Sequence, residues 1–267
     1  MRKYYTRACN FYYGVNARIL IKKKLALPLC GNTKIAFDYI EILSRDKKAK
    51  LINITNIKKL PIKIKKIILI DLKKITAKKK FLNRFKNISE PLIMGVLNLT
   101  PDSFSDGGLY NHSKKAFRHI NNMISSGADI IDVGGESTRP GSKDVPHKIE
   151  WGRLKKVISN FKKKFPKTFL SIDTRKSEVM LKAINHKSDL INDVSGFNYD
   201  QEAIEKIKNY NVWKVLHHMQ GTPGTMQVNP SYKNVLLDIY DFFEKKINSD
   251  FKKFKYKKFI IDPGIGF

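Results

Sequence analysis

Three single polar residues, Asp173, Asn192 and Asp262, each end a short apolar run of the sequence. If these runs are strands that converge, two carboxylates and one amide would gather at one place. Such a set can hold a flat heterocycle by its hydrogen-bond donors, for example a 2-amino-4-oxo pyrimidine, because each buried carboxylate needs a donor to offset its desolvation. Taken singly, an Asp after a strand is most often a helix cap, so the inference depends on convergence.

A first glycine-rich segment, residues 98–108, offers oxygen ligands. Asn98, Asp102 and Asp106 could coordinate a hard cation such as Mg2+, which prefers oxygen. Pro101 and the glycines at its end suit a loop with tight turns. A capped surface loop is the competing interpretation.

A second glycine-rich segment, residues 134–142, offers donors instead. Its glycines allow backbone to approach a ligand closely. Ser137, Thr138 and Arg139 can donate hydrogen bonds to an anion, and Arg139 can do so with two nitrogens at once. A glycine-rich turn with a surface arginine is the alternative.

Residues 217–227 begin with two histidines and a methionine. Adjacent side chains of a strand point to opposite faces, so His217 and His218 are not expected to share a metal ion. One of them is expected to be a polar residue with satisfied hydrogen bonds at the rim of the fold. Met219 is more typical of packing against a ligand ring than of reactivity.

The elements that must position these residues follow a regular alternation. Short, continuously apolar runs are typical of parallel strands buried on both faces, and the segments between them show helical spacing of apolar residues. Polar residues end nearly every run, which favours a (β/α)8 TIM barrel over a doubly wound sheet, and no GxGxxG motif follows the first run. The six predicted strands are 92–99, 128–133, 169–172, 190–194, 212–216 and 259–261.

Helices are predicted between these strands. After Ser113, interpreted as an N-cap, apolar residues recur at i, i+3 and i+4 through Ile124, and Gly127 ends the helix. Similar spacing occurs at 157–161, 179–184 and 235–243.

Residues 1–90 differ in composition. They contain 24 Lys/Arg against 5 Asp/Glu, a formal charge of +19 out of the +28 of the whole chain. Alternating β-branched residues predict strands at 35–40, 52–54 and 62–70, followed by a basic helix near 77–87. We interpret this segment as a small basic, β-rich extension ahead of the barrel domain at 91–267. A nucleic-acid-binding arm is an alternative, but lysines interspersed with isoleucines are more typical of solvated faces.

Composition narrows the class of protein. The 267 residues are 42% hydrophobic and 28% charged, which is ordinary for a globular protein. No apolar run is long enough to span a membrane, and the first residues lack a signal-peptide pattern. Two cysteines do not make a disulfide framework. We therefore expect a cytoplasmic protein that contacts no membrane.

Taken together, the motifs resemble the dihydropteroate synthase family over residues 91–267. The two glycine-rich loops are the specific part of the resemblance, and the other strings follow in that family's order. The strings are TPDSFSDGG at 100–108, GGESTRPGS at 134–142, SIDT at 171–174, IND at 191–193, HMQGTPGTMQ at 218–227 and DPGIGF at 262–267.

The resemblance implies a reaction in which hydroxymethyl-dihydropterin pyrophosphate and 4-aminobenzoate give dihydropteroate and pyrophosphate, with Mg2+ as cofactor. It implies three groups of binding residues. The pterin would contact Asp173, Asn192, Met219, Asp262, Gly266 and Phe267. The pyrophosphate would contact Asn98, Thr138 and Arg139, with Asn98 also on the metal, and the aminobenzoate pocket would include Thr100, Phe104 and Pro140.

The family pattern also has parts that this sequence lacks. Two further βα units, which would supply Lys, Arg and His groups to the site, do not follow Phe267, so no catalytic residue is assigned. By the usual unit length, about 60–90 residues would complete the barrel. We expect this chain alone to be inactive and poorly stable, because six strands would leave two sheet edges exposed, and the full-length protein to be a homodimer. Two alternatives remain, a methyltetrahydrofolate-binding module of a methyltransferase and a non-catalytic pterin-binding subunit.

Overall fold

A computed structural model describes residues 3–78, 91–100, 109–137, 144–222 and 224–265. The chain divides into two compact units, Met1–Ser89 and Glu90–Phe267. Each unit has its own apolar core.

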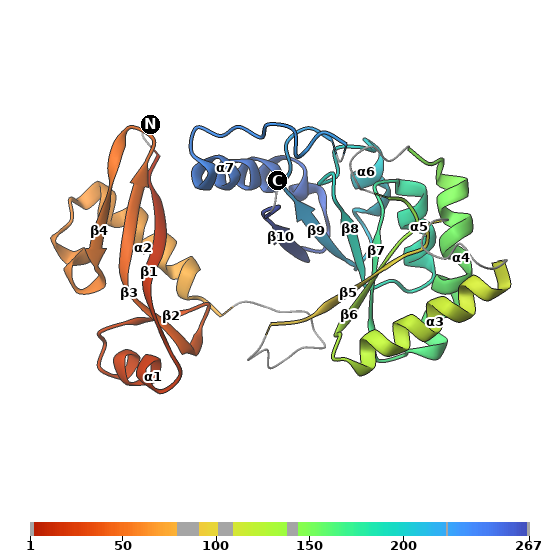
Figure 1. Cartoon of the computed structure of the whole chain (residues 1–267). Coiled ribbons are helices and arrows are strands. Elements are labelled where there is room, and N and C mark those ends of the chain that lie inside the picture. Colours follow the sequence, from red (N-terminus) through yellow and green to blue (C-terminus); the bar gives the residue numbers. More distant parts are fainter. Residues whose placement is uncertain (1–2, 79–90, 101–108, 138–143, 223, 266–267) are drawn as a thin grey trace. The chain divides into compact units, whose positions relative to one another are not determined.

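The first unit is an antiparallel sheet with helices (Figure 1). The long strand β3 is central: β1 pairs along one side of it, and β2 and β4 share the other side. The strand predicted at 35–40 lies in β3, and the one predicted at 52–54 overlaps the end of β4 but not Ile54, which begins the 3-10 helix η1. The elements are β1 (Tyr5–Tyr13), α1 (Gly14–Lys22), β2 (Leu27–Leu29), β3 (Asn32–Ser44), β4 (Lys47–Asn53), η1 (Ile54–Lys59) and α2 (Ile62–Thr76).

The strand predicted at 62–70 is wrong, because this segment is the start of helix α2. Ile64, Ile68, Leu72 and Ile75 recur every three or four residues and pack into the core of the unit. Burial of one helical face outweighs the weak strand preference of β-branched residues. Helix α2 ends at Thr76, and most of the basic helix predicted at 77–87 lies outside the described residues.

The second unit is built on a six-stranded parallel sheet, and all six predicted strands are confirmed. Its strand order is β10-β9-β8-β7-β6-β5, so each strand neighbours the next one in sequence. A doubly wound sheet would reverse direction at a switch point, whereas this order is the one that a TIM barrel requires. The strands are β5 (Met94–Asn98), β6 (Ile130–Gly134), β7 (Phe169–Asp173), β8 (Leu190–Asp193), β9 (Trp213–His217) and β10 (Phe259–Asp262).

Helices connect these strands in the order that the spacing predicts. The N-cap assigned to Ser113 is wrong, because the first of them begins at Leu109 and Ser113 lies inside it. Gly127 does end this helix, with φ of +100°. The five-residue α6 was not predicted, since it is too short for periodicity to show. The helices are α3 (Leu109–Ser125), α4 (His147–Lys164), α5 (Ser177–Asn185), α6 (Ala203–Ile207), α7 (Val235–Ser249) and the short η3 (Phe251–Lys253).

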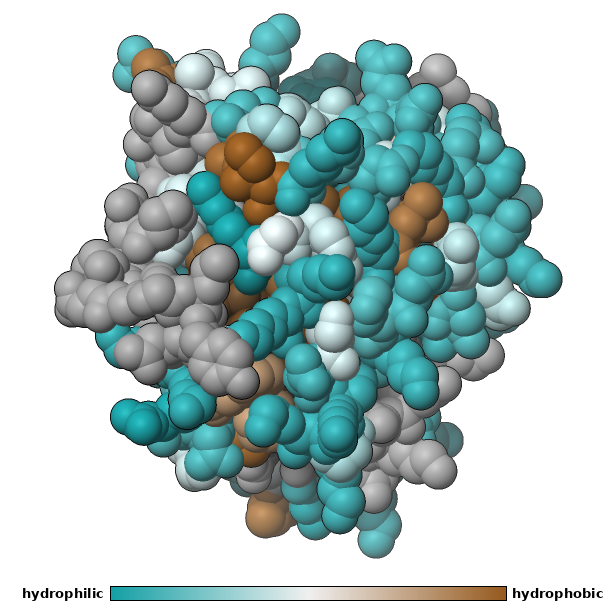
Figure 2. Space-filling model, turned by 90° about the vertical axis from the view of Figure 1, so that its right-hand side faces the viewer, coloured by the Kyte–Doolittle hydropathy of each residue, from teal (hydrophilic) through white to brown (hydrophobic). Residues whose placement is uncertain are grey.

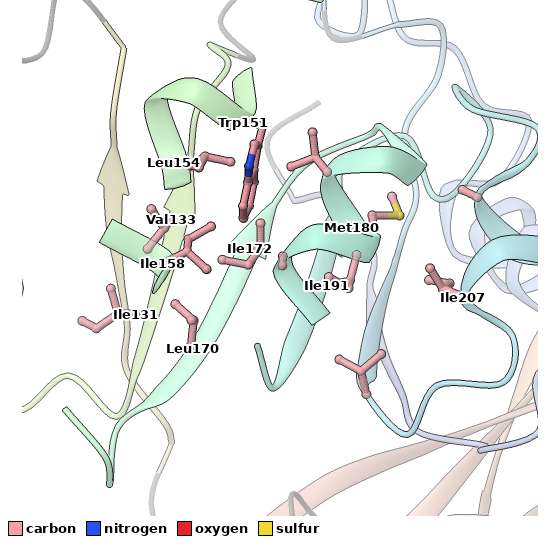
Figure 3. Close-up of a cluster of buried hydrophobic side chains, with 14 of the residues drawn as sticks. Ile131, Val133, Trp151, Leu154, Ile158, Leu170, Ile172, Met180, Ile191 and Ile207 are labelled. Carbon is pink, nitrogen blue, oxygen red and sulfur yellow. The ribbon is translucent and has the colours of Figure 1, made fainter. Parts of the chain in front are cut away.

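The core of this unit lies between the helices and one face of the sheet (Figure 3). Leu170 and Ile172 of β7 are fully buried against Leu154 and Ile158 of α4 and Met180 of α5. Seen from the side of α3 and α4, the surface over this core is mostly hydrophilic (Figure 2). Within the described ranges, no helix has both the length and the apolar character needed to cross a bilayer.

Candidate active site

The opposite face of the same sheet carries polar side chains near the carboxyl ends of its strands. Side chains alternate along a strand, so Ser171 and Asp173 point away from the core that Leu170 and Ile172 enter. Strand register then places the polar residues in one row. Asn98 of β5 pairs with Gly134 of β6, Gly134 with Asp173 of β7, and Asp173 with Asn192 of β8. The parallel ladder therefore brings together three residues that are 75 and 19 positions apart in the chain.

Gly134 makes room in the middle of this row. A Cβ atom at this position would lie 3.3 Å from Asn98 Oδ1 and 3.3 Å from Asp173 Oδ2. The two side-chain oxygens therefore lie near each other above the glycine, where a larger residue would force them apart.

The Asp173 carboxylate receives no hydrogen bond from any residue that the structure describes. Burial raises its pKa well above the ordinary value, and the neighbouring Asp132, Asp193 and Glu150 carboxylates raise it further. A partly buried carboxylate without a described donor is costly, so this position favours a ligand that brings an N–H group.

Asp132 is a site residue that the sequence analysis did not assign. It lies in the apolar strand β6, only 4% exposed, and its Oδ2 accepts a 2.9 Å hydrogen bond from Asn192 Nδ2. Burial raises its pKa, and the hydroxyl of Ser171 on the next strand partly offsets the rise although its hydrogen bond lacks standard geometry. A charged residue between Ile131 and Val133 was the signal that could have identified it.

Asp262 lies two strands beyond Asn192, at the end of β10. Its Oδ1 accepts a hydrogen bond from the Gly264 amide, and its Oδ2 lies 3.9 Å from His217 Nε2. His217 Nδ1 lies 2.6 Å from the carbonyl oxygen of Val194, which can only accept, so Nδ1 bears the proton. His217 thus borders the site, whereas His218 packs its ring against Phe242 and Phe243 on the helix side. The expected division of the two histidines between opposite faces is confirmed.

The remaining predicted residues are only partly described. Thr100 follows β5, and Met219 follows β9; both are half-buried near the ends of their strands. The other predicted contacts lie outside the described residues. They are Phe104, Thr138, Arg139, Pro140, Gly266 and Phe267, together with Asp102 and Asp106.

Glu136 ends the second strand run but does not point into the polar row. Its Oε2 binds Arg175 at 3.0 Å and Lys176 at 2.8 Å, and its Oε1 accepts the amide of Val145. Arg175 also binds Asp144 at 2.7 Å. This buried ion network therefore ties together the two described ends of the segment between β6 and α4.

The oxygen ligands near the row could hold a magnesium ion weakly, but they do not form a complete metal site made of protein side chains. Within the described part of the chain, no three His, Cys, Asp or Glu residues gather as metal ligands. Asn98 is exposed and directs Oδ1 toward the row. Mg2+ usually keeps several waters and binds through one or two protein oxygens plus substrate phosphates, so a single amide ligand is compatible with it.

Comparison with known proteins agrees with this geometry. Residues 94–267 match the family model of pterin binding enzymes. A dihydropteroate synthase of Haemophilus influenzae is 39% identical over 186 residues, which is 69% of this chain and 67% of that protein. The Escherichia coli K12 dihydropteroate synthase is 39% identical over 182 residues, 68% of this chain and 64% of that protein.

Solved structures of such enzymes are also similar. The Yersinia pestis dihydropteroate synthase, solved with a sulfonamide drug complex, has a TM-score of 0.59 at 37% identity, covering 68% of this chain and 66% of that one. The Burkholderia cenocepacia enzyme, complexed with 7,8-dihydropteroate, has a TM-score of 0.58 at 36% identity, covering 68% and 61%. The chain spans about two thirds of the length of the relatives that it matches.

Proposed function

Because this chain belongs to the dihydropteroate synthase family of pterin binding enzymes, we propose that the protein to which it belongs makes 7,8-dihydropteroate. The substrates are 6-hydroxymethyl-7,8-dihydropterin pyrophosphate and 4-aminobenzoate. The aryl amine nitrogen forms a bond to the pterin methylene carbon, and the bond from that carbon to the pyrophosphate oxygen breaks. The amine loses one proton, and pyrophosphate leaves.

The observation that supports this proposal is the row of acceptors on the open face of the sheet. Asp173 has no described donor, and Asn192 lies beside it on the neighbouring strand. The dihydropterin ring presents a 2-amino group and two ring N–H groups, N3–H and N8–H, as hydrogen-bond donors. These donors would satisfy the acceptors, with Asp262 and Met219 completing the contacts to the ring.

The other half of the site handles the leaving group. Asn98 would hold Mg2+, which neutralises charge on the pyrophosphate when bound. Thr138 and Arg139 would donate hydrogen bonds to the same group, stabilising the negative charge that develops as the C–O bond breaks. Thr100, Phe104 and Pro140 would line the aminobenzoate pocket. These loops would also exclude water, which otherwise competes with the weakly nucleophilic amine.

The proposal extends to the setting of the protein. We place the enzyme in the cytoplasm and expect the full-length protein to form a homodimer. Neither nucleic acid nor membrane is a partner in this proposal. No function is assigned to the first unit.

Isothermal titration of the purified protein with the pterin pyrophosphate and Mg2+ tests the proposal. Saturable binding, followed by pyrophosphate release on adding 4-aminobenzoate, is the expected result for the full-length protein. Binding without turnover would favour a pterin-binding subunit. An absence of binding to a folded protein would contradict the assignment.

A further inference from the structure

The side-chain amide of Asn192 has a defined orientation. Its nitrogen donates to Asp132 Oδ2 at 2.9 Å. A carboxylate oxygen has only lone pairs to offer, so the amide nitrogen, and not the oxygen, must face Asp132. Asn192 Oδ1 is then directed away from Asp132, and no described residue donates a hydrogen bond to it.

We propose that Asp132 is a positioning residue that makes Asn192 present an acceptor, and not a donor, to the ligand. This inference rests on the proposed function, since it specifies how the pterin edge is recognised. Asn192 has a second acceptor within reach. Asp173 is its register partner on β7 and has no described donor of its own. Without Asp132, the Asn192 amide nitrogen would turn to Asp173, and both ligand-binding groups would be occupied by each other.

The surroundings of Asp132 argue against a role in stability alone. The residue is buried between Ile131 and Val133 in the strand, and its Oδ1 has no hydrogen-bond partner in the described structure. A buried carboxylate with one unsatisfied oxygen costs free energy that an apolar side chain of similar size would not. The described hydrogen bond that Asp132 accepts comes from Asn192, and it fixes the orientation of the Asn192 side-chain amide.

The consequence is selectivity for donors. With Asp132 in place, Asp173 and Asn192 both offer oxygen atoms along the row. A heterocycle that has N–H groups at this edge is recognised. A heterocycle with an unprotonated ring nitrogen at this edge would place its lone pair against the lone pair of a protein oxygen. The resulting repulsion would exclude it.

Exchanging the two residues provides the test. The probe is 6-hydroxymethyl-7,8-dihydropterin, which keeps the ring N–H groups of the proposed substrate, and its dissociation constant is measured by calorimetric titration. D132N replaces a charged acceptor with a neutral amide that competes less well with Asp173, so we expect binding about 10- to 30-fold weaker. N192D brings two carboxylates together and should also weaken binding. In the double variant D132N/N192D, the Asn side chain at 132 donates to the Asp side chain at 192, whose other oxygen stays an acceptor. Binding should recover to within about fivefold of the parent protein.

S188A is the matched control. Ser188 precedes β8, away from Asp132, and its replacement likewise removes a buried hydroxyl that has no described hydrogen-bond partner. Its affinity should stay within about twofold of the parent protein. If the double variant binds the probe as weakly as the summed losses of the two single variants predict, the inference is overturned. That result would show no coupling between residues 132 and 192.

A ligand-free measurement separates this inference from the proposed function. In nitrogen-15 spectra of the ligand-free protein, the Asn192 side-chain amide signals should shift clearly in D132N and less in D173N, because the amide nitrogen donates to Asp132. A larger shift in D173N than in D132N would overturn the orientation even if pterin binds. Failure of the parent protein to bind pterin would instead contradict the proposed function, while these signals would still decide the orientation.

Discussion

The two faces of the six-stranded sheet differ in the burial and polarity of their side chains. On the helix face, Leu170, Ile172 and Ile191 are completely buried in the apolar core. On the open face, one residue along, Asp173 and Asn192 are partly exposed and lack described donors for their acceptor oxygens. The same strands thus supply stability from one set of alternate residues and ligand chemistry from the other.

This division teaches how the two properties can be varied separately. A substitution on the helix face removes contacts among close-packed atoms, so it should lower the free energy of unfolding. A substitution at a polar residue of the open face removes a side chain that is proposed to contact the ligand, so it should lower ligand affinity with little change in the free energy of unfolding.

Leu170→Ala should produce the largest loss of stability. The side chain is fully buried, and its truncation leaves a cavity that typically costs about 2–5 kcal/mol of unfolding free energy. Urea unfolding followed by circular dichroism measures the change. Val96→Ala is the control on the open face, where the side chain is 54% exposed, and it should cost less than about 0.5 kcal/mol. Equal losses in the two variants would break the comparison.

Asp262→Ala should produce the largest loss of affinity among single changes that leave the fold intact. A hydrogen bond between a charged group and a ligand donor contributes about 1.5–3 kcal/mol, so pterin binding should weaken at least 10- to 100-fold. Calorimetric titration measures this loss. Asp250→Ala removes a carboxylate that pairs with Lys246 at the end of α7, on the helix side, and should leave affinity unchanged. Unaltered pterin affinity in Asp262→Ala would contradict the assigned site.

Asp193, a buried carboxylate on the helix face, should make the free energy of unfolding depend on pH. It is a fully buried residue whose oxygens accept the amides of Ser195 and Phe197, yet burial raises its pKa to about 6. The unfolded chain loses this proton near pH 4, whereas the folded chain keeps it to about pH 6, so the unfolding free energy should fall as pH rises between these values. The fall is about 1–3 kcal/mol for such a difference in pKa.

Asp193→Asn should reduce that slope, because the amide does not titrate. Denaturant midpoints measured from pH 4 to pH 7 give the comparison with the parent protein. The same slope in both proteins would show that Asp193 is not the group responsible.

The smallest effect is expected at the start of α7. Asn234 Oδ1 accepts the amide of Leu237 and caps this helix, so Asn234→Ala should cost about 1 kcal/mol of stability without changing pterin affinity. Asn234→Asp keeps an acceptor at the cap and should remain near the parent protein in thermal unfolding. A loss of affinity in Asn234→Ala would mean that the helix face and the open face are not independent.

Much of the barrel domain was predictable from sequence. Continuous apolar runs predicted all six strands, and the order of motifs indicated the family. The errors fell where two local signals competed. Helix α2 was interpreted as a strand because its isoleucines favour strands locally, although Ile64, Ile68 and Leu72 repeat with helical spacing. The assignment of Ser113 as an N-cap relied on residue type alone, and the helix begins four residues earlier at Leu109.

Strand periodicity is a local property, so the sequence alone indicates which residues are polar at the strand ends and which alternate residues are apolar. Which of these residues meet depends instead on how the strands are aligned in the fold. Strand register set Asn98, Gly134, Asp173 and Asn192 in one row, and it placed Asp132 against Asn192 across 60 positions of chain. The raised pKa of Asp173 likewise depends on burial and on carboxylates from other strands. Distances between residues far apart in the chain are not encoded in any local pattern, so the orientation of the Asn192 amide could not be read before the strands were aligned.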